Sequence, residues 1–87
     1  MALALVKQTA FNAAAATAEL VKKINMEYPQ AEIRPRELPL ADEDVSLEVV
    51  LPLPMAEIYR IRDRLYEWIL ELQERHGVLI LASAVPQ

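Results

Sequence analysis

The longest regular alternation of hydrophobic and polar positions covers residues 54–76 and predicts an amphipathic helix. At about 100° per residue, its apolar positions form one continuous stripe: Ile58, Ile61, Leu65, Trp68, Ile69 and Leu72. Four more apolar positions widen this stripe to an arc of roughly 200°, about twice what a helix over one core requires: Met55, Tyr59, Tyr66 and Leu70. We therefore expect the stripe to face the core and the additional residues to face a partner.

The segments on either side of this helix have the patterns of strands. Residues 45–51 alternate apolar and polar side chains, as a strand with one covered face does, and Pro52 and Pro54 end that strand and begin the helix. Gly77 predicts a left-handed stop after the helix. Residues 78–85 are apolar on both faces and predict an inner strand. Residues 31–38 have the pattern of an extended segment. Any strand that they form should lie at a sheet edge, because Pro35 has no N–H to donate to a neighbouring strand.

The N-terminal third of the chain predicts a first helix. Thr9 or Asn12 could cap it, residues 13–16 are all alanine, and Pro29 ends it after Tyr28. Residues 2–7 fit either a short strand or the beginning of this helix. Both interpretations remain open from the sequence.

The element order predicts an α+β two-layer sandwich, with two helices on one face of a small three- or four-stranded sheet. If residues 2–7 form a strand, the order becomes the ferredoxin-like β-α-β-β-α-β. We expect residues 1–87 to form a single domain. Its predicted core combines both helices and both apolar strands: Val21, Leu47, Val49, Leu51, Ile61, Leu65, Trp68, Leu72 and Ile80.

Composition narrows the classes of function. The chain has 87 residues, is 54% hydrophobic and carries a net charge of −4, which indicates a globular domain and argues against a nonspecific nucleic-acid surface. The absence of cysteine excludes thiol chemistry and disulfides and is typical of the cytoplasm. No uncharged run approaches the ~20 residues of a membrane span, and the apolar N-terminal run is too short for a signal peptide.

The sequence indicates no catalytic, cofactor-binding or metal-binding residue. Its single glycine excludes a glycine-rich phosphate loop. Its single histidine, His76, falls in the last turn of the predicted long helix, where a partial positive charge is favourable. A Ser-His pair would need Ser46 or Ser83 to be brought to it by the fold. The acidic residues Asp42, Asp44 and Glu48 could share a strand face, but we interpret them as a solvated turn.

Three segments of the chain nevertheless resemble minimal nucleotidyltransferases: EYPQAEI (27–33), EDVSLEVVLPLP (43–54) and RIRDRLYEWILELQERHGVLI (60–80). In that family an Asp-x-Asp pair binds catalytic metal, a Gly-Ser motif holds the nucleotide phosphates, and the partner is often a toxin or antitoxin. Asp44 matches the first aspartate, but Ser46 replaces the second and residues 31–38 lack Gly-Ser. The resemblance therefore implies an enzyme relative that has lost its activity.

Arg62 projects into the apolar arc within reach of Tyr59 and Tyr66, a spacing suited to cation–π stacking. Its head could instead extend past the sheet edge into water. Because arginine and tyrosine are enriched at binding hot spots, we predict a non-catalytic interaction domain, most simply a homodimer. The predicted interface residues are Met55, Tyr59, Arg62, Tyr66 and Leu70. The alternatives are a degenerate nucleotidyltransferase and a ferredoxin-like nucleic-acid-binding module, although the latter would lack aromatic residues on its sheet.

Overall fold

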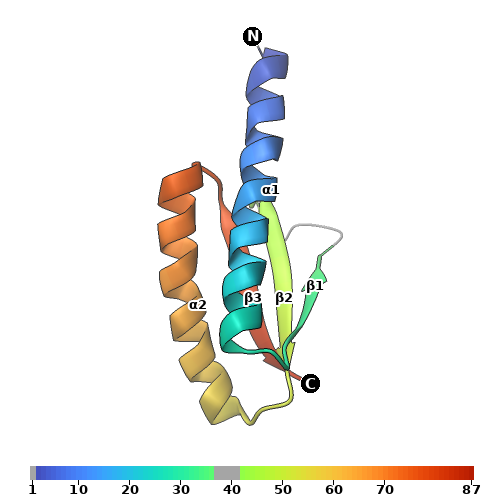
Figure 1. Ribbon diagram of the computed structural model, residues 1–87, viewed down its shortest axis with the longest axis vertical. Coiled ribbons are helices and arrows are strands. Elements are labelled where there is room, and N and C mark those ends of the chain that lie inside the picture. The colour runs from blue at the N-terminus through green and yellow to red at the C-terminus, as the bar shows by residue number, and fades with distance from the viewer. Residues whose placement is uncertain (1, 37–41) are drawn as a thin grey trace.

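Two helices pack against one face of a three-stranded mixed sheet in the computed structural model, which describes residues 2–36 and 42–87, with side chains from residue 9 onward (Figure 1). The described elements are α1 (Ala2–Glu27), β1 (Glu32–Pro35), β2 (Val45–Leu51), α2 (Met55–His76) and β3 (Ile80–Pro86). This arrangement confirms the predicted α+β fold. Asp42 and the residues after it are described, whereas Leu38 and Pro39, which the sequence placed at the end of the edge segment and in the turn, lie outside the described residues.

Helix α2 begins and ends where the sequence predicts. Pro54 is its N-cap, in an extended conformation with φ −69° and ψ 157°. At the other end Gly77 adopts a left-handed conformation with φ 65°, and its N–H donates to the carbonyl of Gln73 at 2.9 Å. Between these ends the predicted apolar stripe from Ile58 to Leu72 is buried. The two flanking residues thus limit the helix to the length that its buried stripe requires.

Strand β2 is the centre of the sheet, with β1 antiparallel on one side and β3 parallel on the other. Within the segment 31–38, the predicted edge position is confirmed for Glu32–Pro35, because β1 stands at one end of the strand order. The prediction that residues 78–85 form an inner strand is wrong, because β3 lies at the opposite edge. An additional strand beside β3 would have had to come from residues 2–7, and these residues are helical.

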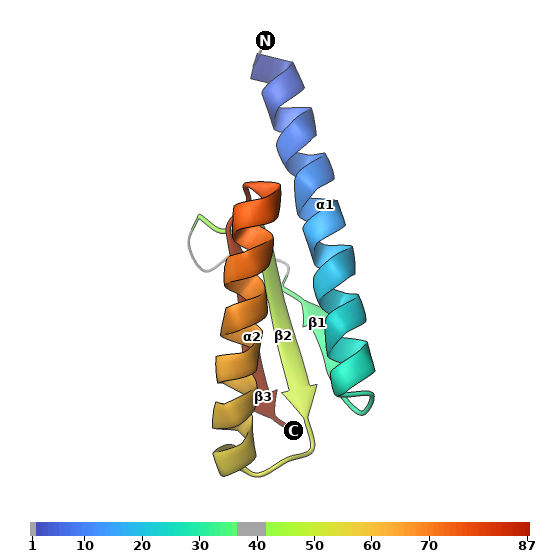
Figure 2. The ribbon, with the colours of Figure 1, turned by 60° about the vertical axis from the view of Figure 1, so that its left-hand side comes forward.

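Helix α1 therefore begins at Ala2, and the elements of residues 2–36 and 42–87 have the order α-β-β-α-β instead of the ferredoxin-like one. The alanine-rich sequence explains this outcome, because alanine has the highest helix propensity. Among the side chains of α1 that the structure describes, Ala13 packs against the core while partly buried, and Ala16, Leu20 and Ile24 are fully buried. Figure 2 shows the N-terminal half of α1 extending past the end of α2 and the sheet. The second half of α1 alone covers the sheet beside α2.

The predicted core is confirmed as one cluster. Eight of its nine residues are buried in it, and Val21 packs against it while partly exposed. Trp68 occupies the junction of the two helices, with its ring centroid 6.3 Å from that of Tyr28. The Nζ of Lys23 and the Cζ of Arg64 lie 5.9 and 5.5 Å from the Trp68 ring centre, which places a cation from each helix against the indole. The indole thus joins α1 to α2 through both apolar and cation–π contacts.

Truncating Trp68 to alanine should lower the free energy of unfolding by about 3–5 kcal/mol, because the change leaves a large cavity between the helices. Glu74→Ala, an exposed change on the same helix, should alter stability by no more than about 0.5 kcal/mol. Urea unfolding monitored by circular dichroism measures both variants. Equal midpoints for Trp68→Ala and wild type would contradict the assignment of Trp68 to the core.

Candidate functional site

All five predicted interface residues lie on one exposed stripe of α2, which we call the outer face: Met55, Tyr59, Arg62, Tyr66 and Leu70. Each of the four apolar side chains keeps a large exposed fraction, from 39% for Met55 to 61% for Tyr66. The outer face is adjacent to the buried stripe and turned away from α1. The structure therefore places these residues together on the surface, as the width of the apolar arc predicts.

A groove of about 240 Å³ separates the outer face from strand β3. Its lining comes from both elements: Arg62, Tyr66, Ile69, Leu70, Gln73, Ile80, Leu81 and Ala82. Apolar atoms provide most of its walls, and its lining includes the polar side chains of Arg62, Tyr66 and Gln73. The groove connects the outer face with the edge of the sheet into one continuous surface.

The hydrogen bonds between β2 and β3 determine which backbone groups of β3 face this groove. The N–H of Val45 donates to the carbonyl of Leu79, and the N–H of Gln87 donates to the carbonyl of Leu51, each at 3.0 Å. In a parallel ladder, successive residues alternate between the two sides of the strand. Residues 79, 81, 83, 85 and 87 therefore direct their N–H and C=O groups toward β2. Residues 80, 82, 84 and 86 direct theirs toward the outer edge.

Two side chains of α2 bond to this outer edge. Arg62 Nε donates to the carbonyl of Ala84 at 3.0 Å, and Gln73 Oε1 accepts from the N–H of Ile80 at 2.9 Å. The Arg62 guanidinium also lies over the Tyr59 ring, with Cζ 5.4 Å from the ring centre. Arg62 therefore stacks on Tyr59, as the cation–π expectation has it, and its head bonds to the sheet edge instead of extending past that edge into water. Sequence reasoning missed Gln73, whose only signal was its position on the same helical stripe as Arg62 and Tyr66.

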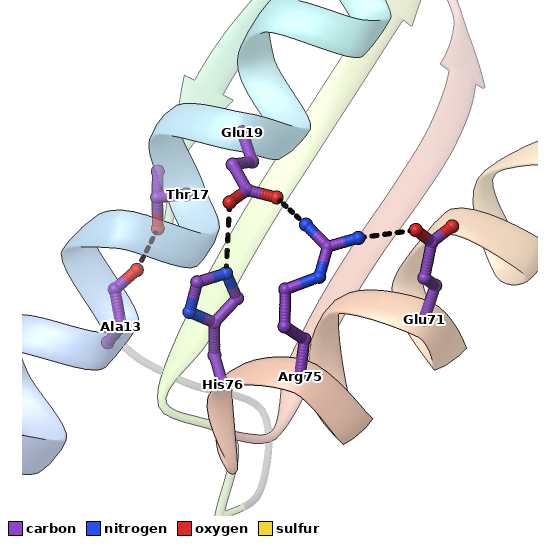
Figure 3. Close-up of polar contacts among 6 residues, drawn as sticks. All are labelled: Ala13, Thr17, Glu19, Glu71, Arg75 and His76. Carbon is purple, nitrogen blue, oxygen red and sulfur yellow. Dashed lines mark hydrogen bonds and ion pairs between the residues drawn. The ribbon is translucent and has the colours of Figure 1, made fainter.

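A second polar cluster connects the C-terminal end of α2 to α1 (Figure 3). The guanidinium of Arg75 donates to the carboxylates of Glu19 and Glu71, and His76 Nε2 lies 3.3 Å from the other Glu19 oxygen. Within α1, Thr17 donates to the carbonyl of Ala13 at 2.8 Å. His76 is in the last turn of α2, as predicted. Because Glu19 is already engaged by two cationic or polar partners, we interpret this cluster as a link between the helices.

Several polar residues near the helix pair and on β1 have pKa values that are shifted by their neighbours. Arg64 pairs with Glu27 at 2.9 Å, and this hydrogen bond raises the pKa of the arginine. Partial burial and the nearby Glu27 carboxylate raise the pKa of Tyr28. On β1, the hydrogen bond from Arg34 lowers the pKa of Glu32. These charged groups are compensated by their neighbours and show no free carboxylate or cation that would suit catalysis.

Two of the three acidic residues around β2, Asp44 and Glu48, have structural partners. The Asp44 carboxylate accepts the N–H of Leu79 at 2.8 Å, while the N–H of Asp44 donates to the carbonyl of Leu79 at the same distance. Glu48 lies 3.7 Å from Arg36, and Asp42 is exposed. Among the described residues, no three His, Cys, Asp or Glu side chains are placed to hold a metal ion. Asp44, the residue that matches the nucleotidyltransferase pattern, therefore fastens the beginning of β3 to β2.

Comparisons with protein-family models, characterised proteins and solved structures find no match for this chain. In the part of the chain that the structure describes, neither helix combines the length and hydrophobicity needed to cross a membrane. The resemblance to minimal nucleotidyltransferases stays a prediction.

Replacing Asp44 by alanine should lower the free energy of unfolding by about 1 kcal/mol, because the N–H of Leu79 loses its side-chain acceptor. Asp44→Asn keeps an acceptor oxygen at the same position and should recover most of that loss. Thermal unfolding in buffer containing a chelator measures the effect without any contribution from metal. Equal stabilities of all three proteins would show that Asp44 does not have this structural role.

Proposed function

We propose that this chain is a non-catalytic protein-interaction domain that forms a homodimer through the outer face of α2. The observation that carries the proposal is the row of exposed apolar side chains from Met55 to Leu70 beside a groove and a free sheet edge. Isolated exposed hydrophobic residues are common on protein surfaces, but a contiguous apolar stripe marks an interaction site.

The size of the domain supports the proposal. A chain of this length buries only about 60% of the surface that its unfolded form exposes. Covering the outer face would add apolar burial that the single copy does not have. The gain is largest for Tyr59 and Tyr66, whose rings are more than half exposed and which have only two rotatable side-chain bonds to order.

Arg62 favours recognition at this surface because its conformation is already restricted. Its Nε bonds to the Ala84 carbonyl and its guanidinium rests on Tyr59. Ordering a free arginine on binding costs roughly 0.5–1.5 kcal/mol, and the contact with Tyr59, which does not involve the sheet edge, avoids part of that cost. Arginine and tyrosine together are also the residues that most often dominate binding energy.

A second copy is the simplest partner for this surface. A two-fold interface brings the same residues of both copies together, so it requires a patch that can contact itself without repulsion. The outer face meets this condition, since its one charged residue, Arg62, lies against Tyr59 of its own chain. The apolar and aromatic side chains around Arg62 carry no charge to repel their counterparts.

The nucleic-acid alternative receives less support. The described strands, with sequences EIRP, VSLEVVL and ILASAVP, contain no aromatic residue on which a base could stack. The basic residues of β1 and the adjacent chain lie against acidic ones, Arg34 against Glu32 and Arg36 against Glu48. No specific observation favours nucleotide chemistry, so the interaction domain is the function that we propose.

Tyr66→Glu should weaken dimerisation by at least about 2 kcal/mol, because it places an unpaired charge in a desolvated contact. The buried stripe of α2 is untouched, so the helical dichroism should remain. The matched control is Ala56→Glu, which introduces the same group on an exposed position of α2 away from the outer face. Sedimentation equilibrium over micromolar concentrations measures association for both variants and wild type.

Two results would contradict the proposal. A wild-type mass equal to one chain at every concentration would exclude the homodimer. Equal association of Tyr66→Glu and Ala56→Glu would show that the copies meet through another surface.

A further inference from the structure

The outer edge of β3 retains backbone groups that no described residue bonds. Its outward-facing positions are Ile80, Ala82, Ala84 and Pro86, and Pro86 has no N–H. Gln73 occupies the N–H of Ile80, and Arg62 occupies the carbonyl of Ala84. Two donors therefore remain, the N–H groups of Ala82 and Ala84. Between Ile80 and Ala84 two acceptors also remain, the carbonyls of Ile80 and Ala82, which makes four groups in this segment. The carbonyl of Pro86 is a further acceptor at the end of the strand.

These four groups are complementary to themselves. In an antiparallel pair, two residues that face each other through their ladder groups exchange both N–H···O bonds. If Ala82 faces Ala82 of a second copy, Ala84 faces Ile80 of that copy. The two Ala82 residues then bond to each other, and the N–H of each Ala84 meets the carbonyl of the opposite Ile80. Every free donor of the edge thereby meets a free acceptor.

We propose that a second copy of this chain pairs its β3 antiparallel to β3 across a two-fold axis at Ala82. The inference rests on the proposed homodimer and specifies its geometry. The three strands of each copy then form one continuous sheet with the helices of both copies on the same face. That arrangement brings the outer face of each α2 toward its counterpart, because the outer face and the β3 edge border the same groove.

In the proposed dimer, backbone groups of the second copy replace the side chains of Arg62 and Gln73 as hydrogen-bond partners of Ala84 and Ile80. In the proposed register the N–H of Ile80 faces the carbonyl of Ala84 of the other copy. A direct bond between them replaces the bond from Ile80 to Gln73 and the bond from Arg62 to Ala84. Neither the N–H of Ile80 nor the carbonyl of Ala84 is left unpaired in either state, which matters because an unpaired buried group costs more than a made bond contributes. Arg62 keeps its contact with Tyr59 after the exchange.

The sequence of β3 permits such an approach. Exposed edges are usually protected by charged residues, a bulge or an interior proline, and β3 carries no charge and has its proline at the last position. Ala82 at the proposed axis has a small side chain, so it offers little steric hindrance to a second backbone. The apolar edge strand and the outer face of α2 thus form one surface for the same partner.

Ala82→Pro tests the pairing directly. The N–H of Ala82 points away from β2, so proline should leave the ladder within the chain intact, as Pro86 does at an equivalent outward position. By symmetry the dimer loses two hydrogen bonds, which should raise the dissociation constant roughly tenfold or more. Ala82→Ser, which keeps the N–H at nearly the same volume, should dimerise as wild type does. Circular dichroism verifies the fold of both variants.

Amide hydrogen exchange of the wild-type protein gives a second measurement that does not depend on a variant folding. The amides of Ala82 and Ala84 should become protected as protein concentration rises through the dimerisation range. A dimer in which both amides exchange as fast as in dilute solution would overturn the edge pairing and leave the proposed function standing. A folded Ala82→Pro that associates like wild type would do the same. A protein that is monomeric at all concentrations would overturn both.

Discussion

The parallel pairing of β2 with β3 is the constraint on which the rest of this structure depends. Two parallel neighbours cannot be joined by a tight turn, because the chain must return along the whole length of the first strand before the second begins. Helix α2 makes that return, from its N-cap at Pro54 to the left-handed Gly77. Its buried stripe must therefore lie on the β2–β3 pair, and α1 covers what remains of the same sheet face.

This constraint also explains why one helix has three structural roles. The side of α2 toward β2 and α1 is buried, while the side over the edge of β3 stays open to solvent. Arg62 and Gln73 lie at the boundary between the buried and the open side of α2. Both bond to β3, the strand that follows α2 in the chain. The helix thus supplies the core, the covering of an otherwise bare sheet edge, and the exposed residues of the proposed interface. A change in the register between α2 and β3 would disturb all three.

The sequence predicted α2 and β2 well because each has a strong period and is delimited by residues with restricted backbones. The position of β3 could not be predicted in this way. A strand with apolar side chains on both faces is expected to be covered above and below the sheet. Its side chains do not reveal whether another strand is hydrogen-bonded to its outer edge. That depended on residues 2–7, whose mixed alanine and leucine pattern fits a strand or a helix and which became helical as part of α1. The outer face was predictable from helical spacing alone, whereas the bond from Gln73 to Ile80 required the three-dimensional register of two elements.

The left-handed turn at Gly77 has a consequence for the unfolded chain. It is the only glycine among 87 residues, which also include six prolines. Glycine broadens and proline narrows the conformations available to an unfolded polypeptide. This chain therefore uses the most permissive residue only where a positive φ demands it. Its disordered ensemble has comparatively few conformations to lose on folding, which offsets part of the disadvantage of a small core.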